Sequence, residues 1–190
     1  MSPITHFLIG WGVANAGGLN RRERACVAIA GIIPDADGLG IVADFLTRHS
    51  AHPLNWWGEY HHILGHNLVF ALLVAAGSFL LATRGSTVAA LTFLSFHLHL
   101  LGDLVGARGP EGEQWPMPYL WPFSDSLQLT WSGQWALNAW PNFLITGIFL
   151  AAMFYLAWQR GFSPLEMVSL RADKAFVATL RARFPRPQAS

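Results

Sequence analysis

The stretch TVAALTFLSFHLHLLGDLV, residues 87–105, decides the fold, because it is apolar enough to cross a membrane and yet carries His97, His99 and Asp103. A membrane helix needs about 20 predominantly apolar residues, and this stretch approaches that length. Ionisable side chains within such a segment are costly and usually face a partner or a water-filled cavity. The stretch therefore predicts a membrane helix that packs in a bundle and contributes to a polar site near one end.

Two further segments, 66–83 and 138–159, approach the same length and contain no Lys, Arg, Asp or Glu. The whole chain is 53% hydrophobic and 12% charged, whereas a soluble domain usually has about 25% charged residues. Shorter apolar runs at 4–16 and 25–34 predict a tilted or half-inserted helical hairpin, and whether it crosses the membrane fully stays open. We expect an all-α, polytopic membrane helical bundle with three long spans plus an N-terminal shorter helical hairpin, in a membrane-embedded domain of residues 1–160.

The basic side chains predict the orientation of this bundle. Cytoplasmic segments of membrane proteins carry an excess of Lys and Arg, and several basic residues follow the last span. We therefore expect residues 161–190 to form a cytoplasmic tail. Ser163, Pro164 and Glu166 have the spacing of a helix start, so the tail is predicted to be an amphipathic helix that lies on the inner leaflet or is solvated. The basic residues in question are Arg160, Arg171, Lys174, Arg181, Arg183 and Arg186.

In this topology, four segment ends on the outer side of the membrane carry His or Asp, which predicts a shared site. The spacing of His99 and Asp103 puts both on one helix face, and Asp35 and Asp37 flank one residue in a turn that begins with proline. Imidazole and carboxylate without thiolate suit zinc, manganese or iron, and the number of donors allows one or two ions. The candidate residues are His6, Asp35, Asp37, His61, His62, His66, His99 and Asp103.

These residues lie in motifs that resemble a known family. The motifs, in chain order, are Thr5–His6, PDAD at 34–37, HHILGHNL at 61–68, HLLGD at 99–103 and WPF at 121–123. Their order is similar to that in membrane-bound metal-dependent hydrolases, the group that contains the LexA-regulated inner-membrane protein of bacteria and is distantly similar to zinc-dependent phospholipase C.

The resemblance implies an α-helical fold in the bacterial inner (cytoplasmic) membrane with a cluster of metal ligands. Carried over to this chain, the ligands or their immediate partners are His6, Asp35, Asp37, His61, His66, His99 and Asp103. At two positions the chain departs from the common family pattern, because His62 replaces an arginine and Asn67 a serine. Whether His61 or His62 is the ligand therefore stays open.

The predicted function is metal-assisted hydrolysis of a phosphoester or other ester of a lipid or lipid-linked substrate at the outer membrane interface. Asp37, or Asp35 if the metal fully engages Asp37, is expected to be the general base. Arg108 or His62 is expected to stabilise developing negative charge, and the loop 106–137 to cover the site. Membrane lipids are the expected partners, and the net charge of +1 gives no reason to expect nucleic acid.

Two other functions are compatible with the same residues. In the first, a bound metal only stabilises the bundle or docks a partner, without catalysis. In the second, His97 or His99 serves a haem or an ion pathway. The sequence does not name the substrate, the metal or the oligomeric state.

Overall fold

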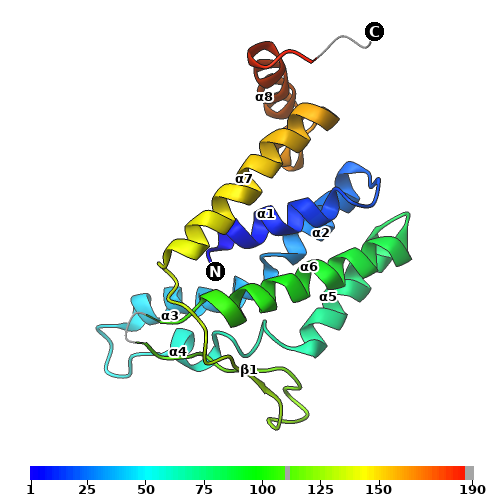
Figure 1. The fold of residues 1–190 in the computed structure, drawn as a ribbon. Coiled ribbons are helices and arrows are strands. Elements are labelled where there is room, and N and C mark those ends of the chain that lie inside the picture. Colours follow the sequence, from blue (N-terminus) through cyan, green and yellow to red (C-terminus); the bar gives the residue numbers. More distant parts are fainter. Residues whose placement is uncertain (110–111, 187–190) are drawn as a thin grey trace.

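The computed structural model describes residues 1–109 and 112–186, and its chain is folded mainly into helices (Figure 1). The helices before the long loop are α1 (Pro3–Ala14), α2 (Arg21–Ala30), the 3₁₀ helix η1 (Ile33–Leu39), α3 (Gly40–Thr47), α4 (Trp56–Tyr60), α5 (Leu68–Leu81) and α6 (Gly85–Gly106). Two short strands, β1 (Met117–Pro118) and β2 (Gln128–Leu129), pair in the loop; α7 (Trp140–Arg160), the 3₁₀ helix η2 (Pro164–Met167) and α8 (Leu170–Arg183) follow.

Within the described part of the chain, two helices, α6 and α7, are long and apolar enough to cross a membrane. A third membrane span is possible if α2 and the segment Ile33–Thr47 together form one span. The axes of these two parts differ by 54°. The helical fold and its apolar spans are therefore as predicted, but three long spans are not confirmed. The segment 66–83, expected to be long, contains α5 of 14 residues.

The late start of α5 has a local cause in Asn67. Its side chain accepts a hydrogen bond from the backbone N–H of Phe70 at 2.8 Å, which caps the helix at residue 68. His62 and His66 therefore precede the helix, so their spacing of four residues does not place them on one helical face. His62 instead has a positive φ of 68°.

The centre of the bundle depends on small residues where α1, α2 and α6 meet. A Cβ added to Gly10 of α1 would lie 2.9 Å from the carbonyl oxygen of Ala28 and 2.8 Å from Oγ of Ser95. Helices in membranes associate through such close packing, because the hydrophobic effect does not drive them together there. On the other side of α6, the helix α5 packs against it around the buried Phe96 and Ala71.

The predicted N-terminal hairpin is formed by α1 and α2, which pack against each other. The buried Glu23 at the start of α2 connects this hairpin to the turn between α5 and α6. Its carboxylate accepts hydrogen bonds from Thr83 Oγ1 at 2.7 Å and from the backbone N–H of Arg84 at 3.0 Å.

The tail 161–190 differs in detail from the single predicted helix, and its last residues, 187–190, lie outside the described residues. Ser163 begins the short η2, and α8 starts separately after Ser169. Glu166 does not complete a capping box; it pairs with Arg24 of α2, whose Nε and Nη2 donate to the carboxylate at 2.6 and 2.8 Å. The tail is thus attached to the bundle, while its location in the cytoplasm stays a prediction.

The glycine crossing generates a test of the fold. Gly10→Ala is expected to lower the thermal unfolding temperature in detergent, because the added methyl group overpacks the crossing at a cost of about 1–3 kcal/mol. Gly147→Ala in α7 is the matched control, since among the described residues nothing lies within 4 Å of its added Cβ. The control is expected to unfold at the same temperature or higher, and an equal loss in both variants would contradict the close packing.

Candidate metal centre

Four side chains from three parts of the chain meet in one group: Asp35, His66, His99 and Asp103. One nitrogen or carboxylate oxygen from each lies within 4.8 Å of those of the others. Asp35 comes from η1, His66 from the segment before α5, and the other two from α6. His66, His99 and Asp103 are buried, whereas the Asp35 side chain keeps 21% of its surface exposed.

The two histidines are oriented through their Nδ1 atoms. His99 Nδ1 lies 2.9 Å from the carbonyl oxygen of Gly31, and His66 Nδ1 lies 3.0 Å from Oδ2 of Asp37. Both of these oxygens only accept hydrogen bonds, so each Nδ1 carries the proton and each Nε2 of a neutral ring presents a lone pair. Ligating histidines in metal sites are commonly fixed in this way.

The two Nε2 atoms face each other at 3.1 Å. Two lone pairs at this distance repel each other unless a cation, either a metal ion or a proton, lies between them. Asp103 Oδ2 is 3.0 Å from His99 Nε2 and 3.5 Å from His66 Nε2, yet it has no hydrogen-bond partner among the described residues. An unpaired buried carboxylate oxygen beside two nitrogen lone pairs is the arrangement that a metal ion satisfies.

The donor set therefore fits a divalent metal. Asp35 Oδ1 lies 3.6 Å from His99 Nε2, which completes a group of two imidazoles and two carboxylates. Such a mixed nitrogen and oxygen set suits zinc, manganese or iron. The geometry thus gives a cluster able to bind a metal ion.

Asp37 lies one step outside this group. Its carboxylate accepts from His61 Nδ1 at 2.8 Å, from His66 Nδ1 at 3.0 Å and from the backbone N–H of Gly65 at 2.9 Å. A side chain at Gly65 would overlap the carbonyl oxygen of Pro34, so this approach requires glycine. Asp37 thus orients His66 and His61, while its predicted roles as a direct ligand and a general base stay predictions.

His6 lies against the other side of the group. Its Nε2 is 3.0 Å from Asp103 Oδ1, its ring is 3.8 Å from that of His99, and its Nδ1 has no hydrogen-bond partner among the described residues. The amino group of Met1 also contacts Asp103 Oδ1. His6 is therefore brought to the cluster, as predicted, through Asp103.

His61 and His62 occupy different environments. The ring of His61 stacks on Trp57 with centroids 5.3 Å apart and bonds to Asp37, whereas His62 is buried and its Nδ1 is unpaired among the described residues. Burial lowers the pKa of His62 to about 3, so its ring is neutral at pH 7. Its expected role in stabilising developing negative charge stays a prediction.

The pKa of His66 is shifted in the opposite direction from that of His62. Burial alone would lower its pKa, but the carboxylates of Asp103 and Asp37 outweigh this effect and raise the pKa to about 9. The surroundings of His66 thus favour a positive charge at the centre of the cluster.

A cavity of about 330 Å³ opens onto the cluster. Its lining includes Asp35, Asp103, His61 and His62, and Trp115 from the long loop packs against both of these histidine rings. The described part of the loop 106–137 therefore helps to cover the site, as expected.

Arg108 and His97, which the sequence singled out, form hydrogen bonds outside the cluster. Arg108 donates from Nη2 to the carbonyl oxygen of Ser132 at 2.7 Å, and no hydrogen bond or ion pair joins it to the cluster within the described part of the chain. Its expected role in charge stabilisation stays a prediction. His97 lies 2.8 Å from both the carbonyl oxygen of Phe93 and the hydroxyl of Tyr119, and so connects α6 to the loop.

A family model described as YdjM inner membrane protein matches residues 1–180 of the chain. The chain belongs to this family. The match includes all residues of the cluster and places the protein in the inner membrane, in agreement with the predicted location. Searches of curated proteins and of solved structures found no match.

Sequence reasoning missed several partners of the cluster. The carbonyl of Gly31 and the backbone N–H of Gly65 carry no signal in their side chains, although the glycines themselves indicate close approach of the backbone. Trp115 stands in a loop whose path the sequence does not reveal.

The role of Asp37 generates a prediction about metal affinity. Asp37→Asn removes the negative charge behind His66, and loss of such a supporting carboxylate typically weakens metal binding about 10–100-fold. Metal content measured by elemental mass spectrometry, and competition with a chelating dye, would reveal the loss. Asp125→Asn, at an exposed loop position, is the matched control. Equal affinities of the two variants would refute the proposed orientation of His66.

Proposed function

We propose that this YdjM-family protein is a metal-dependent hydrolase that acts on a phosphoester or other ester of a lipid or lipid-linked substrate at the membrane interface. The observation that carries the proposal is that the cluster is open on one side. Asp35 is partly exposed and lines the cavity together with Asp103. Structural metal sites are closed by protein ligands, whereas catalytic sites keep a position for water or substrate.

The residues that would hold the metal are His66, His99 and Asp103, with Asp35 at the open side of the group. A divalent ion bound there would lower the pKa of an attacking water and polarise the ester oxygen. Asp37 and the carbonyl of Gly31 fix the two histidine rings, so the donor atoms need little rearrangement when the ion binds.

Asp35 is the best candidate for the general base. Asp37 already accepts three hydrogen bonds, whereas Asp35 Oδ2 has no partner among the described residues. A carboxylate at the mouth of the cavity is able to take a proton from water that enters there. Trp57 and Trp115 line the same cavity and limit its exposure to bulk water.

We further infer that the cluster lies at the outer face of the inner membrane. The support comes from the basic residues of the tail and of the turns at 21–24 and 84, which favour the cytoplasmic side. The cluster is at the end of α6 remote from Arg84. In this arrangement α6 and α7 cross the membrane, and the shorter α5 and the α1–α2 hairpin are inserted beside them.

The proposal is tested by combining turnover with metal content. Purified protein loaded with zinc or manganese is expected to hydrolyse phosphoester lipids in mixed micelles. Asp35→Asn is expected to lower the rate about 10²–10⁴-fold, the range for removal of a general base, while retaining at least part of its metal. His66→Ala is expected to lose both the metal and the activity.

Other outcomes identify the alternatives. Bound metal without turnover of any phosphoester or acyl-ester lipid, together with a large drop in unfolding temperature on chelation, would favour a purely structural metal. Failure of the wild-type protein to bind any divalent metal would overturn the proposal.

A further inference from the structure

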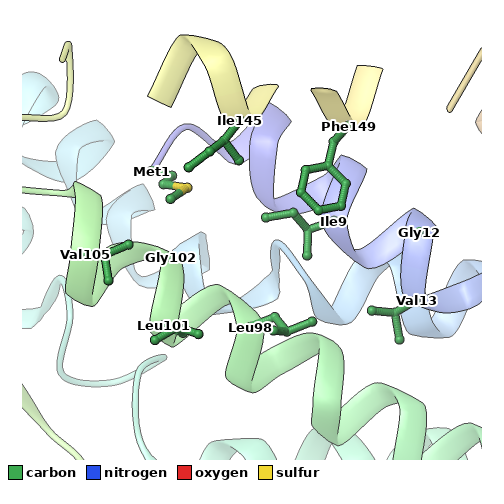
Figure 2. A pocket seen from close by; sticks show the side chains of 10 residues that line it. All are labelled: Met1, Ile9, Gly12, Val13, Leu98, Leu101, Gly102, Val105, Ile145 and Phe149. Atoms are coloured by element: carbon green, nitrogen blue, oxygen red, sulfur yellow. The ribbon is translucent and has the colours of Figure 1, made fainter. Parts of the chain in front are cut away.

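An open apolar groove of about 550 Å³ lies between α1, α6 and α7 (Figure 2). Ile9 and Val13 of α1 line it, with Leu98 and Leu101 of α6 and Ile145 and Phe149 of α7. Figure 2 shows these aliphatic and aromatic side chains directed into the space between the three helices. The groove is distinct from the cavity over the cluster, although Met1 lines both.

The groove results from the way in which α7 packs. This helix contacts α1, and α6 also contacts α1, so the two long helices flank α1 and leave space between them. Both α6 and α7 have the length and hydropathy of membrane spans. In the proposed arrangement of these spans, the space between them lies within the hydrocarbon layer of the membrane, where the surrounding molecules are lipid chains.

One end of the groove reaches the cluster. Gly102 lines the groove and directly precedes Asp103, and a Cβ added to Gly102 would lie 2.9 Å from Cε1 of His6. The absence of a side chain at this position leaves room for the His6 ring and for Met1, which separate the end of the groove from Asp103, and Met1 lines both the groove and the cavity over the cluster. An occupant of the groove has its end next to the cluster.

The dimensions suit one lipid chain. From Leu98 to Val105 the lining follows α6 over eight residues, whose seven steps span about 10 Å at a rise of 1.5 Å per residue. This is about a third of the hydrocarbon thickness of a bilayer, so the groove covers part of a single leaflet. An unfilled groove would leave its lining without dispersion contacts, and an acyl chain from the same leaflet supplies them.

We propose that this groove binds one acyl chain of a membrane phospholipid and places the ester linkage of that lipid at the metal cluster. The inference rests on the proposed function and specifies its substrate class as an acyl-chain lipid that enters from the bilayer. Its lining carries no charged or hydrogen-bonding side chain, so recognition of the tail is by shape, whereas the polar part of the lipid meets Asp35 and the tryptophans of the cavity.

The test uses a phosphatidylethanolamine with a photoactivatable diazirine on one acyl chain, in nanodiscs of phosphatidylethanolamine and phosphatidylglycerol. Peptides labelled on irradiation are mapped by mass spectrometry. We expect labelling of the groove in α6 and α7 to saturate with probe concentration, as binding at a site does. Labelling of the exposed face of α5 around Leu73, which is 64% exposed, is expected to rise linearly.

Gly12→Trp is the variant that fills the groove. Gly12 lines it, and the nearest neighbours of an added Cβ are atoms of the Phe149 ring at 3.7 Å, an ordinary contact that leaves room for a substitution. Gly12→Ala adds one methyl group and serves as the matched control, and Leu73→Trp controls for a new indole that faces lipid. Ile145→Trp fills the groove from α7 if Gly12→Trp does not fold.

The expected result is loss of saturable labelling in Gly12→Trp and its retention in both controls, with unchanged metal content in all three. Hydrolysis of the phospholipid is expected to be lost together with the labelling. Non-saturable labelling of the groove in the wild-type protein, or cross-links there to a second copy of the chain, would overturn the inference.

Failure of this inference is distinguishable from failure of the proposed function. Turnover of lipid without saturable labelling would retain the hydrolase and reject the tail site. Saturable labelling in a protein that never hydrolyses a lipid would reject the hydrolase and, with it, the presentation of an ester to the cluster.

Discussion

The approach of His66 and His99, with their Nε2 atoms 3.1 Å apart, is the interaction on which the rest of the site depends. It brings the segment before α5 against α6 through two polar rings that are buried. In an apolar interior such groups are stable only when each is satisfied. The backbone of Gly31 and the carboxylate of Asp37 satisfy their outer nitrogens, and the inner nitrogens require a cation. Metal binding and assembly of this end of the bundle are therefore expected to be coupled.

The surroundings of the cluster explain why it is placed at the end of a span. Deep in the hydrocarbon layer, a group of carboxylates and imidazoles would have no access to water and a high cost of burial. Near the end of α6 the same group has apolar packing on one side and the opening lined by Asp35 on the other. One helix can therefore supply both a membrane anchor and two ligands, and a lipid substrate would not have to leave the bilayer to reach them.

The sequence predicted those features that follow from spacing within one element. His99 and Asp103 lie four residues apart on α6, and the proline-initiated turn brings Asp35 to the same site, as expected. The length of α5 and the separate environments of His61 and His62 were not predictable, because they depend on the cap formed by Asn67 and on a loop of irregular path. Arg108 illustrates the same limit, since its nearest acceptor, the carbonyl of Ser132, lies 24 residues away in the chain.

Gly65 has a consequence for how sequences of this kind can diverge. A Cβ added to Gly65 would overlap the Pro34 carbonyl oxygen, and the Gly65 N–H donates to Asp37, so that the two halves of the site meet at a point with no room for even one methyl group. A metal ligand can be replaced by another donor residue of similar length. Glycine at position 65 has no such replacement, because every other amino acid has a side chain that would overlap the Pro34 carbonyl oxygen. In related chains with histidines at the positions of His61 and His66, a glycine at the position of Gly65 is therefore a better indicator of an assembled site than the two histidines alone.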